Sequence, residues 1–361
     1  MDTVPATLVT GLPRAGKAAL LRQWLAAKPA GERWALLRNQ ADAGGFRVRL
    51  PGGRADAGDG FEADAIETIG GCACCSGRLA FETALVRLLR RGPWSRLLIE
   101  LDDSGDPARF VDLLRAGAAG RHLRLDDVVA VADAETARAW LEDAPADAAV
   151  RSGSGSGGLR DRLLAAQLES ADRVVLTGCG ALADPQACKA LAASLRIRSP
   201  FRRRVEIAQD PETPASPPGI APDSPEAWPR LTPPESAQSE YALAHVAAGG
   251  LRSMGIAHPD APAWATWRWP PETGFDRADL ERLIADWRAL PGLLQAEGAF
   301  RTARDWYLWR RDANRDAWSP TGWRRDNRLA LRLAADPGSF ERLAAAVEAG
   351  LVGAIRMGPP G

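Results

Sequence analysis

Short apolar runs alternate with amphipathic stretches along the first half of the chain. The amphipathic stretches carry apolar residues at helical spacing, as over Leu79–Arg91 and Phe110–Ala116. A further helix is expected at about 159–170. The apolar runs are four or five residues long, as buried strands are, and they are Thr7–Thr10, Trp34–Arg38, Leu97–Leu101, Val128–Ala132 and Val174–Thr177. Because strands that alternate with helices form βαβ units, the pattern predicts an α/β domain: a parallel sheet with helices on both faces.

The pattern changes at Glu206. From there to Glu240 the chain contains nine prolines and almost no periodicity, which indicates an extended linker. Within the first half, Arg151–Gly158 is rich in Gly and Ser and indicates a flexible surface insertion before a helix. We therefore expect a first domain over residues 1–205, a linker over 206–240 and a second domain over 241–361.

The second domain is predicted to be smaller and of the α+β class. Its expected elements are a strand at Ala263–Trp269, a helix at Asp276–Leu290 with Asp276 as N-cap, paired strands near 296–303 and 305–311, a strand at 327–334 and a closing helix near 339–350. Nine of the 13 tryptophans lie at or after Trp228, so we expect aromatic packing to fill the core there. A tryptophan-lined ligand groove is the alternative.

The segment after the first apolar run has the pattern of a phosphate-binding loop. It fits G-x-x-x-x-G-K and leads from a predicted strand into a predicted helix. In such loops backbone N–H groups surround the phosphates and the lysine reaches the terminal ones, whereas an ordinary strand–turn–helix corner is the alternative. The next residue, usually Ser or Thr that binds Mg²⁺, is Ala here. The candidate nucleotide-binding residues are Gly11, Leu12, Pro13, Arg14, Ala15, Gly16, Lys17, Ala18 and Ala19.

Two further segments carry candidate metal chemistry. Cys72, Cys74 and Cys75 form a C-x-C-C cluster, and three thiols this close can converge on one ion such as Zn²⁺. The alternative is that they are three small buried hydrophobic residues. Leu97–Glu100 is an apolar strand that ends in an acid, which is the layout of a Walker B element whose acid orients Mg²⁺ or its waters.

Composition narrows the class of protein. A formal net charge of zero argues against a nucleic-acid-binding surface. No apolar run reaches the roughly 18 residues that a membrane span requires, and the first residues lack the regions of a signal peptide. Five cysteines, three of them within four positions, suit a reducing compartment and metal or thiol chemistry better than a disulfide framework. We expect a cytoplasmic protein with no nucleic-acid or membrane partner.

Taken in order, these segments resemble the CobW-like P-loop GTPases, which are nucleotide-dependent metal-insertion proteins and metallochaperones. The resemblance covers the whole chain apart from the linker and the Gly/Ser insertion. The loop reads GLPRAGKAALL beside the family's G-F-L-G-A-G-K-T-T-L-L, and Glu67–Cys75 fits E-x-x-x-G-C-x-C-C. The other similar segments, with the family pattern in parentheses, are Asn39–Asp42 (N-E-F-G), Glu100–Pro107 (E-T-S-G-L-A-D-P), Val128–Asp133 (a strand ending in Asp), Ala171–Gly180 (A-D-x-h-h-L-N-K-x-D, h apolar) and Leu293–Gly298 (L-L-R-A-K-G).

The resemblance implies a fold, an activity and a set of ligands. The fold would be a P-loop NTPase-type domain followed by a CobW C-terminal-like domain. The activity would be that of a GTPase, an NTP hydrolase in which Lys17 and Glu100 serve catalysis. GTP or another NTP would bind with Mg²⁺ at the loop, Zn²⁺ or a similar divalent ion at Cys72, Cys74 and Cys75, and a client metalloprotein would receive the metal.

The departures from the family pattern fall on the nucleotide site. Ala18 lacks the Mg²⁺-binding hydroxyl. The Asn, Lys and Asp of N-K-x-D are replaced by Thr177, Gly178 and Gly180, so we expect guanine selectivity to be lost. Asp103 stands where a glycine would sense the terminal phosphate.

Two smaller departures complete the comparison. Gln40 stands where a family acid can contribute to metal binding. Cys179, inside the N-K-x-D element, is either an accidental replacement or an extra thiol, and we favour the accidental replacement. Three hypotheses follow. The first is a nucleotide-binding metallochaperone that couples nucleotide state to metal transfer. The second is a non-hydrolysing pseudo-GTPase that acts as a metal-binding or protein-docking module, and the third is a tryptophan-rich second domain that binds a protein while the first is a scaffold.

Overall fold

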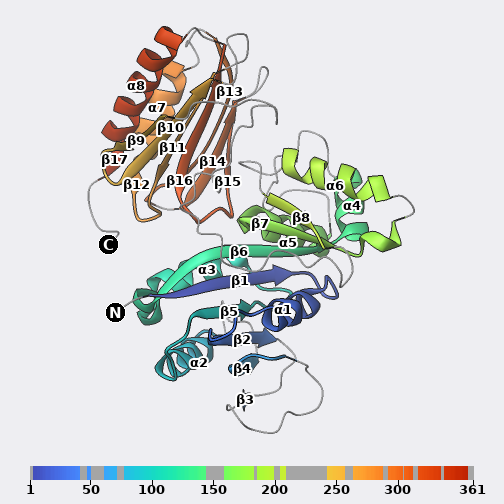
Figure 1. Cartoon of the computed structure of the whole chain (residues 1–361). Helices are drawn as coiled ribbons and strands as arrows, with labels where there is room; N and C mark the ends of the chain where they lie inside the picture. The colour runs from blue at the N-terminus through green and yellow to red at the C-terminus, as the bar shows by residue number, and fades with distance from the viewer. Residues whose placement is uncertain are drawn as a thin grey trace. The chain divides into compact units, whose positions relative to one another are not determined.

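The chain forms two compact units, which we describe separately. Unit 1 comprises Met1–Ser199 and Arg203–Trp228, and unit 2 comprises Pro200–Arg202 and Pro229–Gly361. The computed structural model (Figure 1) describes residues 3–40, 47–49, 61–70, 77–143, 158–182, 185–198, 204–208, 242–256, 263–287, 292–303, 305–311, 316–334 and 337–356.

Unit 1 is built on an eight-stranded sheet. The strand order is β3-β4-β2-β5-β1-β6-β7-β8, and every neighbouring pair is parallel except β3 with β4. Each of the five predicted apolar runs lies in or along one of these strands, so the predicted parallel sheet is confirmed. The strands are β1 (Val4–Gly11), β2 (Trp34–Gln40), β3 (Arg47–Arg49), β4 (Ala65–Gly70), β5 (Arg96–Glu100), β6 (Leu123–Asp133), β7 (Arg173–Thr177) and β8 (Arg204–Ile207).

Helices cover both faces of this sheet, as predicted. They are α1 (Lys17–Ala26), α2 (Arg78–Arg90), α3 (Pro107–Ala116), α4 (Ala134–Asp143), α5 (Leu159–Ser170) and α6 (Pro185–Arg198), with 3-10 turns η1 (Ala118–His122) and η2 (Cys179–Ala181). Within β5, Leu97 and Ile99 belong to the core cluster that includes side chains of α2, α3, α5 and α6, whereas Leu98 belongs to the cluster that includes side chains of α1. A strand buried on both faces has a continuous apolar sequence, which is why the sequence pattern revealed it.

Unit 2 is an antiparallel sheet with two helices. The strand order is β15-β14-β13-β16-β11-β10-β9, and α7 and α8 lie side by side on it (Figure 1). Its core contains the fully buried Trp267, Trp269 and Trp309, so the predicted aromatic core of an α+β unit is confirmed. The elements are β9 (Ala242–Val246), β10 (Gly250–Ile256), β11 (Ala263–Trp269), β12 (Gly274–Phe275), α7 (Arg277–Trp287), β13 (Leu293–Arg301), β14 (Trp306–Arg311), β15 (Asp316–Pro320), β16 (Asn327–Leu333), α8 (Pro337–Gly353) and β17 (Ile355–Arg356).

The predicted start of the linker is wrong by two residues. Glu206 and Ile207 belong to β8, whose Val205 is buried in the core of unit 1. The strand escaped the sequence pattern because two of its four residues are charged: Arg173 of β7 pairs with Glu206 at 3.3 Å between Nη1 and Oε1. Residues 209–240 of the predicted linker and 151–157 of the Gly/Ser insertion lie outside the described residues. No described helix is long and apolar enough to cross a membrane.

Candidate phosphate site and the elements around it

The phosphate-loop candidate joins β1 to α1 at the carboxyl edge of the parallel sheet. Gly16, which caps α1, has φ +95°, and a Cβ there would lie 3.2 Å from Cγ2 of Thr177. L-residues rarely adopt this conformation, and Thr177 leaves little room, so glycine is required. The first N–H groups of α1 have no intrahelical acceptor and carry the positive end of the helix dipole, which favours an anion at this point.

Lys17 is folded back over the loop. Its Nζ donates to the carbonyl oxygen of Gly11 at 2.7 Å and of Leu12 at 3.4 Å, and the residue is only 7% exposed. The same ammonium forms an ion pair with the carboxylate of Asp103. The loop is therefore formed as the sequence predicts, but its lysine already has an anionic partner from the segment after β5.

Arg14 occupies the tip of the loop in a left-handed conformation, with φ +62°. The similar family loop has a glycine at this place. The left-handed region costs an L-residue about 1–2 kcal/mol. The loop thus has a left-handed residue at its tip although this residue is Arg14 and not a glycine, which would adopt the conformation without steric cost.

The segment from Asp102 to Pro107 holds Asp103 in place. Asp102 Oδ1 accepts hydrogen bonds from Ser104 N at 3.0 Å and Ser104 Oγ at 2.6 Å. Asp106 caps α3, since its Oδ1 accepts from Ala108 N at 3.0 Å, and Pro107 takes the first helical position. Gln167 of α5 donates to the carbonyl oxygen of Asp103 at 3.1 Å. This segment is anchored at both ends, so the carboxylate of Asp103 is fixed beside the loop.

Glu100, predicted to act as a Walker B acid, is engaged by a cation. Its Oε2 accepts from Nε of Arg38 on β2 at 2.6 Å, and both side chains are 7% exposed. The guanidinium of Arg38 also lies 4.6 Å from the centre of the Phe61 ring. Ala18 offers no oxygen, and Glu100 is held in a buried ion pair. These residues therefore do not provide the usual Mg²⁺ ligand set of a P-loop protein.

The segment after β7 contacts the phosphate loop directly. Thr177 Oγ1 donates to the carbonyl oxygen of Ala15 at 2.8 Å. Gly178 has φ +70°, and a Cβ at this position would lie 2.5 Å from Oδ1 of Asp133. The backbone here is thus shaped for glycine where the family has the lysine of N-K-x-D. Thr177, Gly178 and Gly180 thus stand at the Asn, Lys and Asp positions of N-K-x-D, and none of them has an amide, ammonium or carboxylate side chain.

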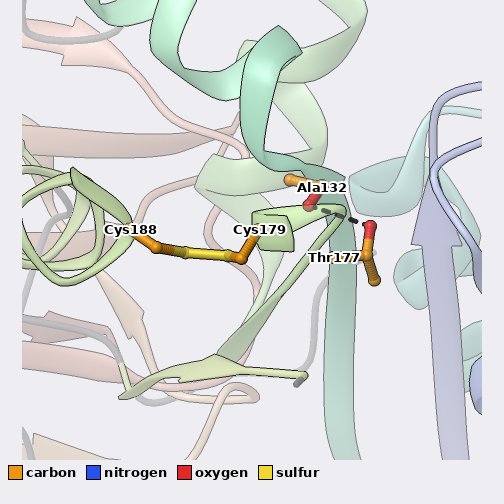
Figure 2. Close-up of a disulfide and its surroundings, with 4 residues drawn as sticks. All are labelled: Ala132, Thr177, Cys179 and Cys188. Atoms are coloured by element: carbon orange, nitrogen blue, oxygen red, sulfur yellow. Dashed lines mark hydrogen bonds between the residues drawn. A yellow bond between two sulfur atoms is a disulfide. The ribbon is translucent and has the colours of Figure 1, made fainter. Parts of the chain in front are cut away.

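Cys179 is bonded to Cys188, a pairing that we did not predict (Figure 2). Cys179 begins η2 after β7 and Cys188 lies on α6, with 5.8 Å between their Cα atoms. Our interpretation of Cys179 did not anticipate this bond. The spacing of nine residues was no signal by itself, because the contact between η2 and α6 brings the two side chains together.

The cysteine cluster Cys72, Cys74 and Cys75 lies outside the described residues, which end before it at Gly70 and resume at Gly77. Gly70 ends β4 and pairs in register with Gln40 at the end of β2. Because the strands from β4 to β1 are parallel, the chain leaves β4 at the same edge of the sheet as the phosphate loop. Among the described residues, no group of three or more His, Cys, Asp or Glu could hold a metal ion.

Glu67, the acid of the cysteine motif, is fully buried on β4. Its Oε1 lies 3.1 Å from Nη1 of Arg91, without hydrogen-bond geometry. Burial raises the pKa of Glu67, and Arg91 and Arg87 only partly oppose it. Glu67 therefore lies in the interior of unit 1 on β4, five positions before Cys72 in the sequence.

Comparison with known proteins agrees with this architecture. The family described as "CobW/HypB/UreG, nucleotide-binding domain" matches residues 5–202. The zinc chaperone YeiR of Escherichia coli (strain K12) is 38% identical over 109 residues, which span 30% of this chain and 31% of that protein.

Two solved structures of the YjiA GTPase are also similar. The Zn(II)-bound protein from E. coli is 16% identical with a TM-score of 0.42, and a Zn(II)-bound triple mutant is 18% identical with the same TM-score; each comparison covers 98% of this chain and 99% of the other. The family match extends over more than half of the 361 residues. The chain belongs to the CobW/HypB/UreG family of proteins with a nucleotide-binding domain.

Proposed function

We propose that this chain is a nucleotide-binding metal chaperone that passes Zn²⁺ or a similar divalent ion to a client metalloprotein in the cytoplasm. The observation that carries the proposal is the phosphate loop: Gly16 keeps its left-handed cap, and Lys17 is folded over the loop by the carbonyl oxygens of Gly11 and Leu12. Family membership and the name of the zinc chaperone YeiR support zinc as the cargo.

Cys72, Cys74 and Cys75 are the proposed metal ligands. Thiolates favour Zn²⁺ over hard cations, and three of them need one more ligand for a tetrahedral site. The end of β4 at Gly70 supports this assignment, since the chain enters the cysteine segment from the edge of the sheet that carries the phosphate loop. A nucleotide at that loop would therefore lie at the edge from which the metal segment starts.

The proposed nucleotide contacts are the backbone of Gly11–Ala19 and the ammonium of Lys17. We expect GTP and ATP to bind with similar affinity, because Thr177, Gly178 and Gly180 offer no guanine-recognition side chains. We also expect little dependence on Mg²⁺, because Ala18 has no hydroxyl and Glu100 is paired with Arg38. Hydrolysis should be slow, since phosphoryl transfer relies on metal placement and electrostatic positioning.

A second candidate is a non-hydrolysing pseudo-GTPase that binds metal or docks a protein. The observation that favours it is the ion pair between Asp103 and Lys17, in which a side chain of the protein takes the charge position of a phosphate. Under this alternative Lys17 and Glu100 have structural roles and no catalytic one.

One set of measurements on the purified chain tests both candidates. Bound zinc is counted in the wild type, in Cys74→Ser and in the matched control Ala73→Ser, which alters the same segment without removing a thiol. We expect the metal to be lost only in Cys74→Ser; equal metal in all three proteins would refute the cysteine site.

GTP and ATP are titrated with and without Mg²⁺, with Lys17→Ala as the non-binding control. Tight binding of GTP with strong preference over ATP would contradict the proposed base indifference, and Mg²⁺-dependent phosphate release above the Lys17→Ala background would eliminate the pseudo-GTPase.

A further inference from the structure

We propose that Cys179 and Cys188 are a reversible thiol–disulfide site that controls nucleotide binding at the phosphate loop. The inference rests on the proposed function only in its second half, since the thiol chemistry needs no nucleotide. Figure 2 shows the bond near Thr177, whose Oγ1 also donates to the carbonyl oxygen of Ala132 on β6 at 3.4 Å.

The placement of the two cysteines suits a bond that forms and breaks in the folded protein. Their Cα atoms are 5.8 Å apart, within the range of about 4.4–6.8 Å in which disulfides form without backbone movement. Cys188 is 3% exposed and packs in the core of unit 1, whereas Cys179 is half-buried between the exposed Gly178 and Gly180. We therefore assign Cys179 as the sulfur that a small thiol attacks and Cys188 as the protected partner.

The disulfide is coupled to the phosphate loop through one residue. Thr177 lies two positions before Cys179 and donates through Oγ1 to Ala15 in the loop at 2.8 Å. Its methyl group borders Gly16, the cap of α1. When the bond between Cys179 and Cys188 is closed, η2 is fixed against α6, and Thr177 is held at the loop. When the bond is open, η2 loses its covalent anchor, and the loop loses a fixed neighbour.

The exchange is balanced with a low-molecular-weight thiol and its disulfide. A thiolate attacks Sγ of Cys179, the bond between the two cysteines breaks, and the sulfur of Cys188 leaves and takes a proton. A second thiolate attacks the mixed disulfide, which releases Cys179 as a thiol and the small molecule as its disulfide. Two electrons and two protons enter the protein, and the reverse sequence oxidises it.

The closed bond is expected to strengthen nucleotide binding, because the loop is then ordered before the ligand arrives. We expect Kd for GTP to rise about three- to tenfold on reduction. By linkage, saturating nucleotide stabilises the disulfide form and lowers the reduction potential of the pair. A tenfold difference in Kd between the two forms corresponds to a shift of about 30 mV for a two-electron couple.

Trypsin separates this pair from the other cysteines, which makes the chemistry readable. Cleavage after Arg173 and Lys189 gives a peptide, Val174–Lys189, that contains both Cys179 and Cys188. Cleavage after Arg54 and Arg78 gives Ala55–Arg78, which contains the other three cysteines. The chain is equilibrated in glutathione buffers of increasing oxidised fraction, alkylated and digested, and the 174–189 peptide is weighed for two alkyl groups or one internal disulfide. The same samples are titrated with fluorescent GTP.

We expect the 174–189 peptide to change state cooperatively across the buffers and nucleotide affinity to follow it. Cys179→Ser should hold affinity at the reduced level in every buffer, whereas Ala193→Ser, at an exposed position on α6, should respond as the wild type does. A peptide that stays fully alkylated in the most oxidising buffer would overturn the site. A peptide that oxidises while affinity stays constant would overturn its control of binding. Absence of nucleotide binding in both states would overturn both the control of binding and the proposed function. The state of the 174–189 peptide would still decide whether the thiol–disulfide site exists.

Discussion

Asp103 determines the charge that a nucleotide meets at the phosphate loop. It lies 86 positions after Lys17 in the sequence, yet its carboxylate pairs with the ammonium that would bind a phosphate. The Asp103 side chain is 41% exposed, so the pair itself contributes little to stability. Its effect is on binding, because an incoming phosphate must displace one anion and then lie close to it.

Replacing Asp103 with Asn should strengthen nucleotide binding. We expect Kd for GTP and ATP to fall about three- to tenfold, since tenfold corresponds to about 1.4 kcal/mol and both competition and repulsion are removed. Fluorescence titration at low salt measures the change. Asp112→Asn, which removes the same charge from an exposed position on α3, is the control and should leave Kd within about twofold. An unchanged Kd in Asp103→Asn would show that the carboxylate does not compete with phosphate.

At the scale of elements, the N-cap residue of α3, Asp106, stabilises the segment that holds Asp103. The cap at Asp106 begins α3 three positions after Asp103, and that helix packs Phe110 against Phe81 of α2 with 4.7 Å between ring centres. A frayed first turn would therefore disturb both the core and the segment that holds Asp103.

Removing this cap should destabilise unit 1 measurably. Asp106→Ala leaves the N–H groups of the first turn unpaired, and we expect the free energy of unfolding to fall by about 1 kcal/mol. Asp106→Asn keeps a side-chain oxygen acceptor and should lose much less. Urea denaturation followed by circular dichroism compares the two variants. Equal loss of stability in both would mean that charge, not capping, makes Asp106 important.

Some elements of unit 1 could be predicted from the sequence, and others could not. The loop Gly11–Lys17 and its flanking strand and helix were predictable, because strand, turn and helix are adjacent in sequence. β4 and β8 were missed because the buried Glu67 and the ion-paired Glu206 interrupt their apolar pattern. The contact between Arg38 and Glu100 joins residues 62 positions apart, and no local spacing indicates such a pair.

For the whole molecule, the two units have separate cores and should respond differently to acid. In unit 2, Asp326 is buried and pairs with Arg328 and Arg268, each at 2.6 Å from Oδ2. Burial opposes ionisation, but these arginines lower the pKa of Asp326 below its ordinary value of 3.8. The stability that this carboxylate contributes is therefore fully present above about pH 4 and is lost as pH falls through the folded-state pKa.

Asp326→Asn should unfold unit 2 more easily at neutral pH. Removing one partner of a buried ion pair costs about 3–5 kcal/mol, because the arginines lose their counter-charge. The variant should also lose less further stability than the wild type when pH falls below about 4. Tryptophan fluorescence during denaturation reports the change, since Trp267, Trp269 and Trp309 are buried there. Asp286→Asn, on the exposed face of α7, should change stability by less than about 0.5 kcal/mol; a similar loss in both variants would contradict a special role of Asp326.

The left-handed glycine at position 178 limits how this molecule can evolve. A lysine restored there would have to accept φ +70° and displace Oδ1 of Asp133, while the other oxygen of that carboxylate accepts hydrogen bonds from Thr136 at the start of α4. A single Gly178→Lys substitution would therefore strain the backbone after β7 and disturb the carboxylate at the start of α4. A side chain can be accommodated at position 178 only if the backbone after β7 is rebuilt first.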